Sequence, residues 1–197
     1  LNNQRPATPT IAGSLLGDVQ SGHIAAVGFD LYCEMVTEAI DNLNGIVKES
    51  INEVTIDIPG DALIPEDYVS KQDQRFDLYR RLSSAKDESD VHAISEELVD
   101  RFGPIPEVTS NLIEVTLLRV LCQSVRISSI VTNKNAFRLI GREIPQSLQV
   151  RLGRISKGSL YKPAHVLGPA EIIVKIEGPG SKAKQIYDLI AELFEGS

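Results

Sequence analysis

The side chains that most often do chemistry are few in this sequence, and they are widely separated. The three histidines, His23, His92 and His165, are isolated, and none pairs with another histidine or a cysteine at metal-ligand spacing. The two cysteines, Cys33 and Cys122, lie far apart on segments with helical patterns, which indicates buried thiols in a reducing cytosol. The sequence therefore predicts no metal site and a cytoplasmic location.

A glycine-rich stretch at 178–184, GPGSKAK, superficially resembles a phosphate-binding loop. It lacks the four-residue spacer and the terminal Gly-Lys-Ser/Thr of a P-loop, and it joins a predicted strand to a predicted helix as an ordinary turn does. The sequence also contains no Gly-x-Ser-x-Gly motif and no local Cys–His arrangement. We therefore expect that this chain is not itself an enzyme and holds no cofactor.

Two carboxylates stand out in a predicted helix that Ser89 or Asp90 can cap and that ends at Gly103-Pro104. An ideal helix turns 100° per residue, which places Glu97 and Asp100 about 60° apart on its outer face. The opposite face carries a single apolar stripe, formed by Val91, Ile94, Leu98 and Phe102. The spacing thus predicts a helix that buries one side and presents acids on the other.

The two acids differ in their local partners along the helix. Glu97 can pair with Arg101 four residues later, whereas Asp100 has a like charge, Glu96, four residues before it. Asp100 also lies at the negative end of the helix dipole, so its placement costs about 0.5–1.5 kcal/mol. Costs of this size are common on surfaces, and two interpretations stay open: a solvated acidic face, or one that meets a basic partner.

The net charge of −7 is unevenly distributed along the chain. Residues 1–60 carry two basic and eight acidic side chains, residues 61–110 six and twelve, and residues 111–197 twelve and seven. An acidic surface repels DNA phosphates and attracts basic protein patches. The C-terminal part favours an alternative, binding of duplex DNA through its basic side chains: Arg138, Arg142, Arg151, Arg154, Lys157 and Lys162.

The order of the predicted elements is that of an α+β domain. It comprises a strand near 54–58, three helices between about 71 and 125, a hairpin over 126–141, a short helix near 144–152, a strand at 171–177 and a last helix that Ser181 can cap. Strands and helices are segregated rather than strictly alternating, which favours α+β. Upstream, a helix is expected over 28–44, and residues 1–12 read as a linker. No apolar run approaches the ~20 residues that span a bilayer, so no membrane contact is expected.

The segments GDALIPEDYV and QRFDLYRRLSSAKDESDVHAISEELVDRFGPIP resemble the C-terminal domain of the bacterial transcription-repair coupling factors (the Mfd family). The resemblance extends from about Asn52 to Arg126. Upstream, GSLLGDVQSGHIAAVGFDLYCEMVTEAI resembles the end of the motor section, a motif shared with RecG-type translocases. Together, the two resemblances imply that the chain has two parts: the end of the motor motif with a linker helix over 1–51, and a C-terminal regulatory domain over 52–197.

The resemblance implies a parent protein that is an ATP-driven translocase on double-stranded DNA. It displaces stalled RNA polymerase and recruits UvrA for nucleotide excision repair, with ATP and Mg²⁺ bound in motor sequence that this chain does not contain. Gln20 matches the glutamine that helps to couple hydrolysis to movement. The Arg-rich run that normally precedes Gly13 is replaced by linker-like sequence at 6–12. We therefore expect residues 1–50 not to act as a motor element by themselves.

For the C-terminal domain, the resemblance implies an autoinhibitory clamp. Such a domain packs on a UvrB-like N-terminal module of the same polypeptide and masks the surface that UvrA would bind. The acids of the family's Glu-Leu-Ile/Val-Asp stretch contribute to the contact, and they match Glu97 and Asp100 here. The expected site is thus an interdomain surface rather than a catalytic centre.

Overall fold

The structure, a computed structural model, describes residues 54–133, 136–166 and 168–196. Gln20 and the helix expected over 28–44 lie outside the described residues. The elements, in chain order, are β1 (Thr55–Asp57), α3 (Gln72–Ser84), α4 (Glu88–Phe102), α5 (Glu107–Val125), β2 (Ile127–Asn133), β3 (Ala136–Gly141), α6 (Gln146–Ile155), β4 (Leu160–Lys162), β5 (Ala170–Val174) and α7 (Lys182–Phe194). The α+β prediction is confirmed, and β4 is a strand that the sequence pattern did not indicate.

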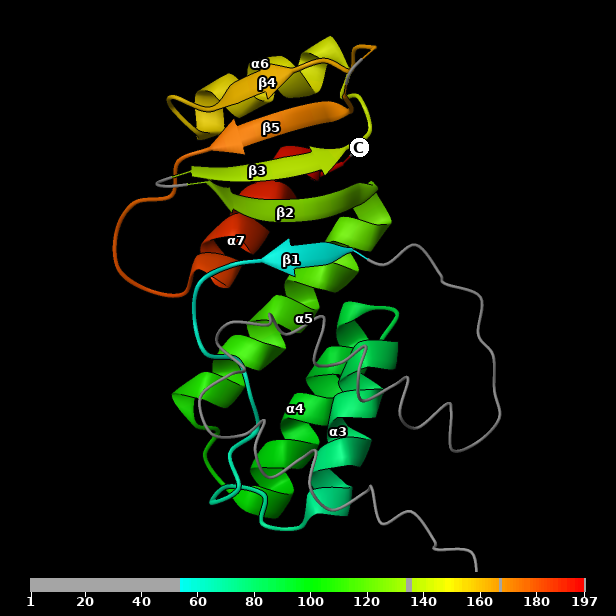
Figure 1. The fold of residues 1–197 in the computed structure, drawn as a ribbon, viewed down its shortest axis with the longest axis vertical. Helices are drawn as coiled ribbons and strands as arrows, with labels where there is room; N and C mark the ends of the chain where they lie inside the picture. The colour runs from blue at the N-terminus through cyan, green and yellow to red at the C-terminus, as the bar shows by residue number, and fades with distance from the viewer. Residues whose placement is uncertain (1–53, 134–135, 167, 197) are drawn as a thin grey trace, which may run out of the picture.

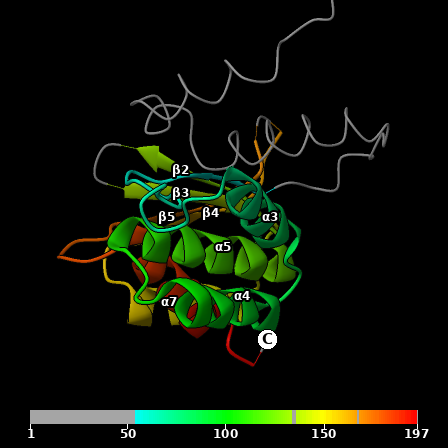
Figure 2. The ribbon, with the colours of Figure 1, turned by 90° about the horizontal axis from the view of Figure 1, so that it is seen from below.

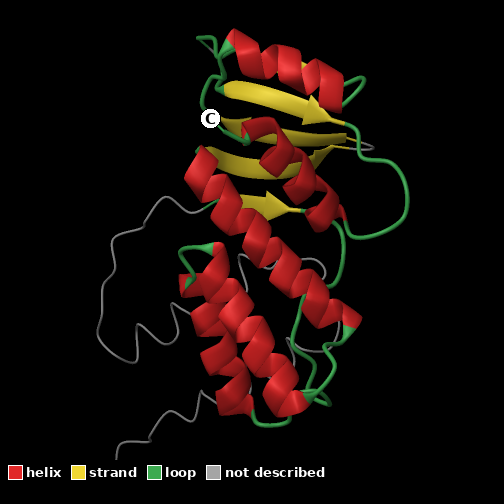
Figure 3. Cartoon of the chain, turned by 180° about the vertical axis from the view of Figure 1, so that it is seen from behind, coloured by secondary structure: helices red, strands yellow, loops and turns green. Residues whose placement is uncertain are grey.

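The strands form one mixed sheet in the order β1-β2-β3-β5-β4 (Figure 1). β1 runs parallel to β2, and the other neighbouring pairs are antiparallel. Ile130 pairs with Ile56 on one side and with Leu139 on the other, and Leu139 pairs in turn with Ile172. All four side chains are buried, because this face of the sheet is covered by α5 and α7 (Figure 3).

Helices α3 and α4 lie beyond the β1 edge of the sheet, and α5 connects them to it. The 19 residues of α5 contact α4, β2 and α7, and Figure 2 shows this helix crossing between the strands and α4. Leu118, near its middle, is fully buried. Since one helix belongs to both ends of the molecule, the buried side chains form a single cluster that includes Leu98 at one end and Leu139 at the other.

Helix α4 begins two or three residues earlier than the pattern indicated. Asp87 is its N-cap, with an extended backbone and a carboxylate that accepts a hydrogen bond from the Asp90 N–H at 3.0 Å. The Asp90 carboxylate in turn accepts from the Lys86 N–H at 2.9 Å. Ser89 and Asp90, expected as caps, already lie inside the helix, because a cap must be the last residue with non-helical backbone.

Candidate functional site

The C-terminal end of α4 carries the predicted acids, and its buried side holds it in place. Val91, Ile94 and Leu98 point into the core, and Leu98 is completely inaccessible. The helix ends where the Gly103 N–H donates to the Val99 carbonyl at 3.0 Å, with Gly103 at φ 85°. Glycine adopts this conformation without strain. The apolar stripe and the stop at Gly103-Pro104 are therefore confirmed.

Tyr68 fixes this helix end, and sequence reasoning missed it. Its hydroxyl lies 3.1 Å from the Leu98 carbonyl and 3.0 Å from the Gly103 carbonyl. Its ring meets Phe102 edge-on, with 5.9 Å between centroids, and the Arg101 guanidinium lies 4.9 Å from the centroid of Phe102. Leu98 lies inside α4 and Gly103 is its C-cap, so this hydroxyl connects the loop before α3 to the end of the helix. The contact fixes the position of the acids.

Glu97 is engaged within the domain. One carboxylate oxygen pairs with Arg101, as predicted, and the other lies 2.7 Å from the Arg81 guanidinium on α3. The Glu97 side chain is 26% exposed. Hydrogen bonds from Arg81 and then Arg101 hold the pKa of the carboxyl below its usual range. Glu97 therefore links α3 to α4, and most of its charge is compensated.

Asp100 has no such partner among the described residues, and it is exposed. With Ala93, Glu96 and Val99 it forms a surface that we name the α4 outer face; all four side chains are exposed. Val99 is 50% exposed, so the α4 outer face offers an apolar side chain beside two carboxylates. The arrangement suits a partner that offers a basic side chain together with an apolar contact.

Three of the six basic residues of the C-terminal part are engaged in contacts within the domain. Arg138 pairs with Glu171, which Lys162 also approaches at 3.9 Å, and the Arg138 hydrogen bond lowers the pKa of that carboxyl. Arg151 donates to the Leu193 and Glu195 carbonyls at the end of α7. The members of the set without a partner among the described residues are Arg142, Arg154 and Lys157.

The glycine-rich turn at 178–184 acts as a structural connection. Ser181 caps α7 by accepting a hydrogen bond from the Lys184 N–H at 3.3 Å, as expected from the sequence. The Lys182 ammonium donates to the Gly178 carbonyl at 3.0 Å and so turns back onto the loop. The lysine that a phosphate loop would direct at its ligand is therefore used to close the turn.

Other reactive side chains show no clustering in the described part of the chain. No group of three or more His, Cys, Asp or Glu residues there could hold a metal ion. Cys122 is fully buried, and burial raises the pKa of its thiol to about 12. His92 is exposed on α4, whereas His23 and Cys33 lie outside the described residues. No helix in the described ranges is both long enough and apolar enough to cross a membrane.

Comparison with known sequences finds that the chain is similar to transcription-repair-coupling factors. The TRCF domain family matches residues 58–149. A transcription-repair-coupling factor of Mycobacterium tuberculosis is 35% identical over 196 residues, which cover 92% of this chain and 16% of that protein. One from Myxococcus xanthus is 41% identical over 116 residues, covering 59% of this chain and 10% of that protein. The chain thus spans only a small part of the length of these relatives.

A solved structure has a similar fold. The crystal structure of the C-terminal domain of a transcription-repair coupling factor superposes with a TM-score of 0.61, covering 73% of this chain and 90% of that one. The identity is 18%, so this likeness bears on the fold alone. The predicted boundary between residues 51 and 52 lies outside the described residues and stays a prediction. The family match, the identity over most of the chain and the shared fold show that the chain belongs to the TRCF domain family and carries the C-terminal domain of a transcription-repair-coupling factor.

Proposed function

We propose that this domain is an autoinhibitory clamp within a longer polypeptide. In the closed state its α4 outer face packs on a basic surface of a UvrB-like module and masks the surface that UvrA binds. The observation that carries the proposal is Asp100: an exposed carboxylate without a partner among the described residues, beside the half-exposed Val99, on a helix end fixed by Tyr68. Such a rigid acidic surface is suited to a reversible contact.

The energy required of this contact is modest. Holding 99% of molecules closed needs about 2.7 kcal/mol in favour of the closed state. Interdomain interfaces of this kind are polar and cover about 600–1,500 Å². One or two charge-assisted hydrogen bonds to Asp100 and Glu96, with apolar contact at Val99, are of the right size. Glu97 contributes mainly by holding α4 against α3.

The parent protein is proposed to be an ATP-driven translocase on double-stranded DNA that displaces stalled RNA polymerase and recruits UvrA. Gln20 would belong to its coupling motif. In the glycine-rich turn at 178–184, the Lys182 ammonium donates to the Gly178 carbonyl rather than pointing outward. ATP and Mg²⁺ are therefore proposed to bind elsewhere in the parent protein, and the isolated chain is expected to show no ATP hydrolysis.

The clamp is tested in the full-length protein by the substitution Asp100→Lys. A lysine in the last turn of α4 is favourable for the helix dipole, so the fold is expected to persist. Removal of the contact should strengthen UvrA binding in the absence of RNA polymerase by about tenfold or more, as measured by surface plasmon resonance. Glu192→Lys, which reverses an exposed acid in the last turn of α7, is the matched control. Equal UvrA affinities for Asp100→Lys, the control and the unmodified protein would exclude this role for Asp100.

A second candidate function is binding of duplex DNA through the C-terminal part. It is favoured by one observation: Arg142, Arg154 and Lys157 are exposed and have no partner among the described residues. A titration of the chain with duplex DNA at two salt concentrations separates the candidates. A measurable affinity that falls steeply with salt supports this role, and no binding at low salt excludes it.

A further inference from the structure

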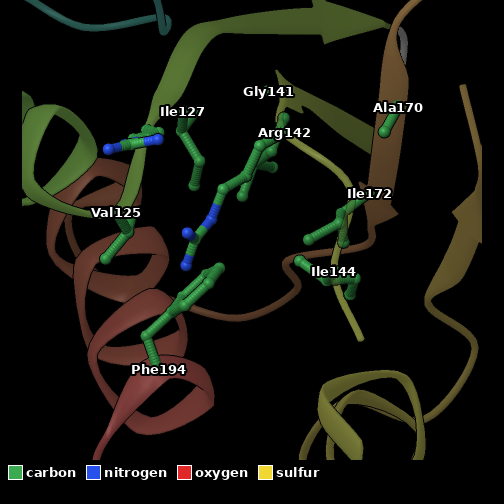
Figure 4. A pocket seen from close by; sticks show the side chains of 10 residues that line it. Val125, Ile127, Gly141, Arg142, Ile144, Ala170, Ile172 and Phe194 are labelled. Carbon is green, nitrogen blue, oxygen red and sulfur yellow. The ribbon is translucent and has the colours of Figure 1, made fainter. Parts of the chain in front are cut away.

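Most glycines in the described ranges are required by their backbone conformation or by close packing. Six of them have a positive φ. A Cβ on Gly141, which Figure 4 shows, would lie 2.6 Å from the Arg126 carbonyl oxygen. Gly153 meets neither condition, because it lies inside α6 and a Cβ there would meet no heavy atom within 4 Å. The fold of the domain therefore gives no reason for glycine at this position.

The exposed side of α6 is suited to close contact with a second helix. A glycine lowers the stability of a helix relative to alanine, but it lets another backbone approach closely. Gly153 is exposed, and Val150, one turn before it, is 50% exposed. Residues that break a local rule without benefit to the fold are expected at functional sites. Gly153 thus indicates a contact outside the domain.

The same side of α6 ends in two cations. Arg154 follows Gly153 directly, and Lys157 lies two residues after the helix ends. Both side chains are exposed, and neither has a partner among the described residues. Arg151, by contrast, is engaged at the end of α7. We name Val150, Gly153, Arg154 and Lys157 the α6 outer face.

The α4 outer face has the complementary composition. It combines the small Ala93 and the half-exposed Val99 with the carboxylates of Glu96 and Asp100, which lack a partner in the described part of the chain. On both faces the charged residues follow the first small or apolar residue, toward the C-terminal end of the helix. A parallel alignment of the two helices therefore places the carboxylates of one face against the cations of the other.

We propose that the α4 outer face of one copy of this chain packs on the α6 outer face of a second copy. Figure 1 shows α4 and α6 at different ends of the molecule, so the two faces of one chain do not meet. Because the paired surfaces differ, the association is head-to-tail and is not closed by a dimer. A second copy is the favoured occupant because this chain itself carries the matching surface.

The contact is small, so the association is expected to be weak. Two short helices offer less than the roughly 800 Å² per partner of a stable complex. We expect a dissociation constant on the order of 0.1–1 mM at low salt. Salt should weaken the contact further, because it screens exposed charges. An affinity of this size acts where several copies are held close together.

The proposal does not rest on the autoinhibitory clamp, although both use the α4 outer face. A second copy bound there would compete with the closed state. The association is measured with this chain alone, without UvrA or a UvrB-like module. A failure of this test therefore leaves the clamp untouched, and equal UvrA affinities in the clamp experiment leave the association untouched.

The test uses two variants of the 197-residue chain, each with one face neutralised. The α4-neutral variant carries Glu96→Gln and Asp100→Asn, and it keeps the cations of α6. The α6-neutral variant carries Arg154→Gln and Lys157→Gln, and it keeps the acids of α4. All four substitutions are at exposed positions, so both folds are expected to persist. The isotope-labelled α4-neutral variant is titrated with the unlabelled α6-neutral variant and followed by nuclear magnetic resonance.

Saturable shifts are expected at the amides of Val150 and Gly153, and none on the neutralised α4 outer face. Neither variant alone should show shifts that depend on its concentration. Gly153→Val in the labelled variant should weaken the association about tenfold, because its side chain holds the two helices apart. Valine is tolerated in a helix better than glycine, so unfolding does not explain a loss there.

Arg142→Gln in the labelled variant is the matched control. Arg142 is an exposed arginine that extends toward Phe194 (Figure 4), and the association should be unchanged without it. The proposal is overturned if no shift appears up to about 2 mM of the added variant, or if shifts appear equally on both faces of the labelled one. It is also overturned if Gly153→Val weakens the association no more than this control does.

Discussion

On α4, the ionised side chains that lack a partner among the described residues are acidic, whereas at the end of α6 they are basic. Glu96 and Asp100 represent the first region, Arg154 and Lys157 the second. Figure 1 shows the two regions at different ends of the molecule, with α3 and α4 at one end and α6 at the other. The charge asymmetry of the sequence thus persists at the surface, reduced to a few residues.

Pairing decides which charges remain available. Glu97 is compensated by Arg81 and Arg101, whereas Asp100 on the same side of the helix has no partner among the described residues. On α6, Arg151 is used to close the end of α7. The net charge of a segment therefore does not show which of its charged side chains are available to a partner, because an internal ion pair removes a charge from outside contacts.

The largest expected change in the free energy of unfolding distinguishes the buried side of α4 from its exposed side. Leu98→Ala should lower the free energy of unfolding by about 2–5 kcal/mol, because it leaves a cavity at a fully buried position. Val99→Ala, one residue later and 50% exposed, should change it by less than about 0.5 kcal/mol. Urea unfolding followed by circular dichroism measures both. A large loss in Val99→Ala would contradict an accessible outer face.

A smaller change in the free energy of unfolding, of opposite sign, is expected at Arg126, near the other end of the molecule, where this residue caps α5 with a positive φ of 62°. Arg126→Gly should raise the free energy of unfolding by about 0.5–1 kcal/mol, since glycine adopts the left-handed conformation without the cost that arginine bears. The gain is the net of this relief and of the lost attraction to the α5 dipole. Thermal unfolding at neutral pH measures it. A decrease would mean that the Arg126 side chain contributes more to the fold than its contacts indicate.

The smallest expected change in the free energy of unfolding concerns Glu97, whose charge is compensated by two arginines. The pKa of Glu97 is lower in the folded chain than its usual value of 4.5, so the unfolded chain binds more protons as the pH falls. The stabilisation is present above pH 4.5 and is lost as the pH falls through the folded pKa. Glu97→Gln should cost about 0.3–0.5 kcal/mol at pH 7, since the arginine partners are partly exposed. It should also flatten the pH dependence of urea unfolding below about pH 5, and an unchanged profile would contradict the ion pairs.

The sequence predicted the elements well because their signals are local. The apolar stripe of α4, its stop at Gly103-Pro104 and the Ser181 cap each depend on residues within one or two turns of helix. The hairpin of β2 and β3 was likewise predicted. β4 was missed because its strand character comes from pairing with β5, a contact that no local pattern reveals.

The sequence by itself determined the order of helices and strands, the acidic middle and basic end, and which face of α4 is buried. Tertiary structure alone decided that Arg81 reaches Glu97, that Tyr68 closes α4, and that the Arg142 N–H donates to the Arg126 carbonyl. Each of these contacts joins residues 16 or more positions apart, beyond the reach of helical or strand periodicity. Only the packing of α3, α4 and α5 and the pairing of the strands bring them together.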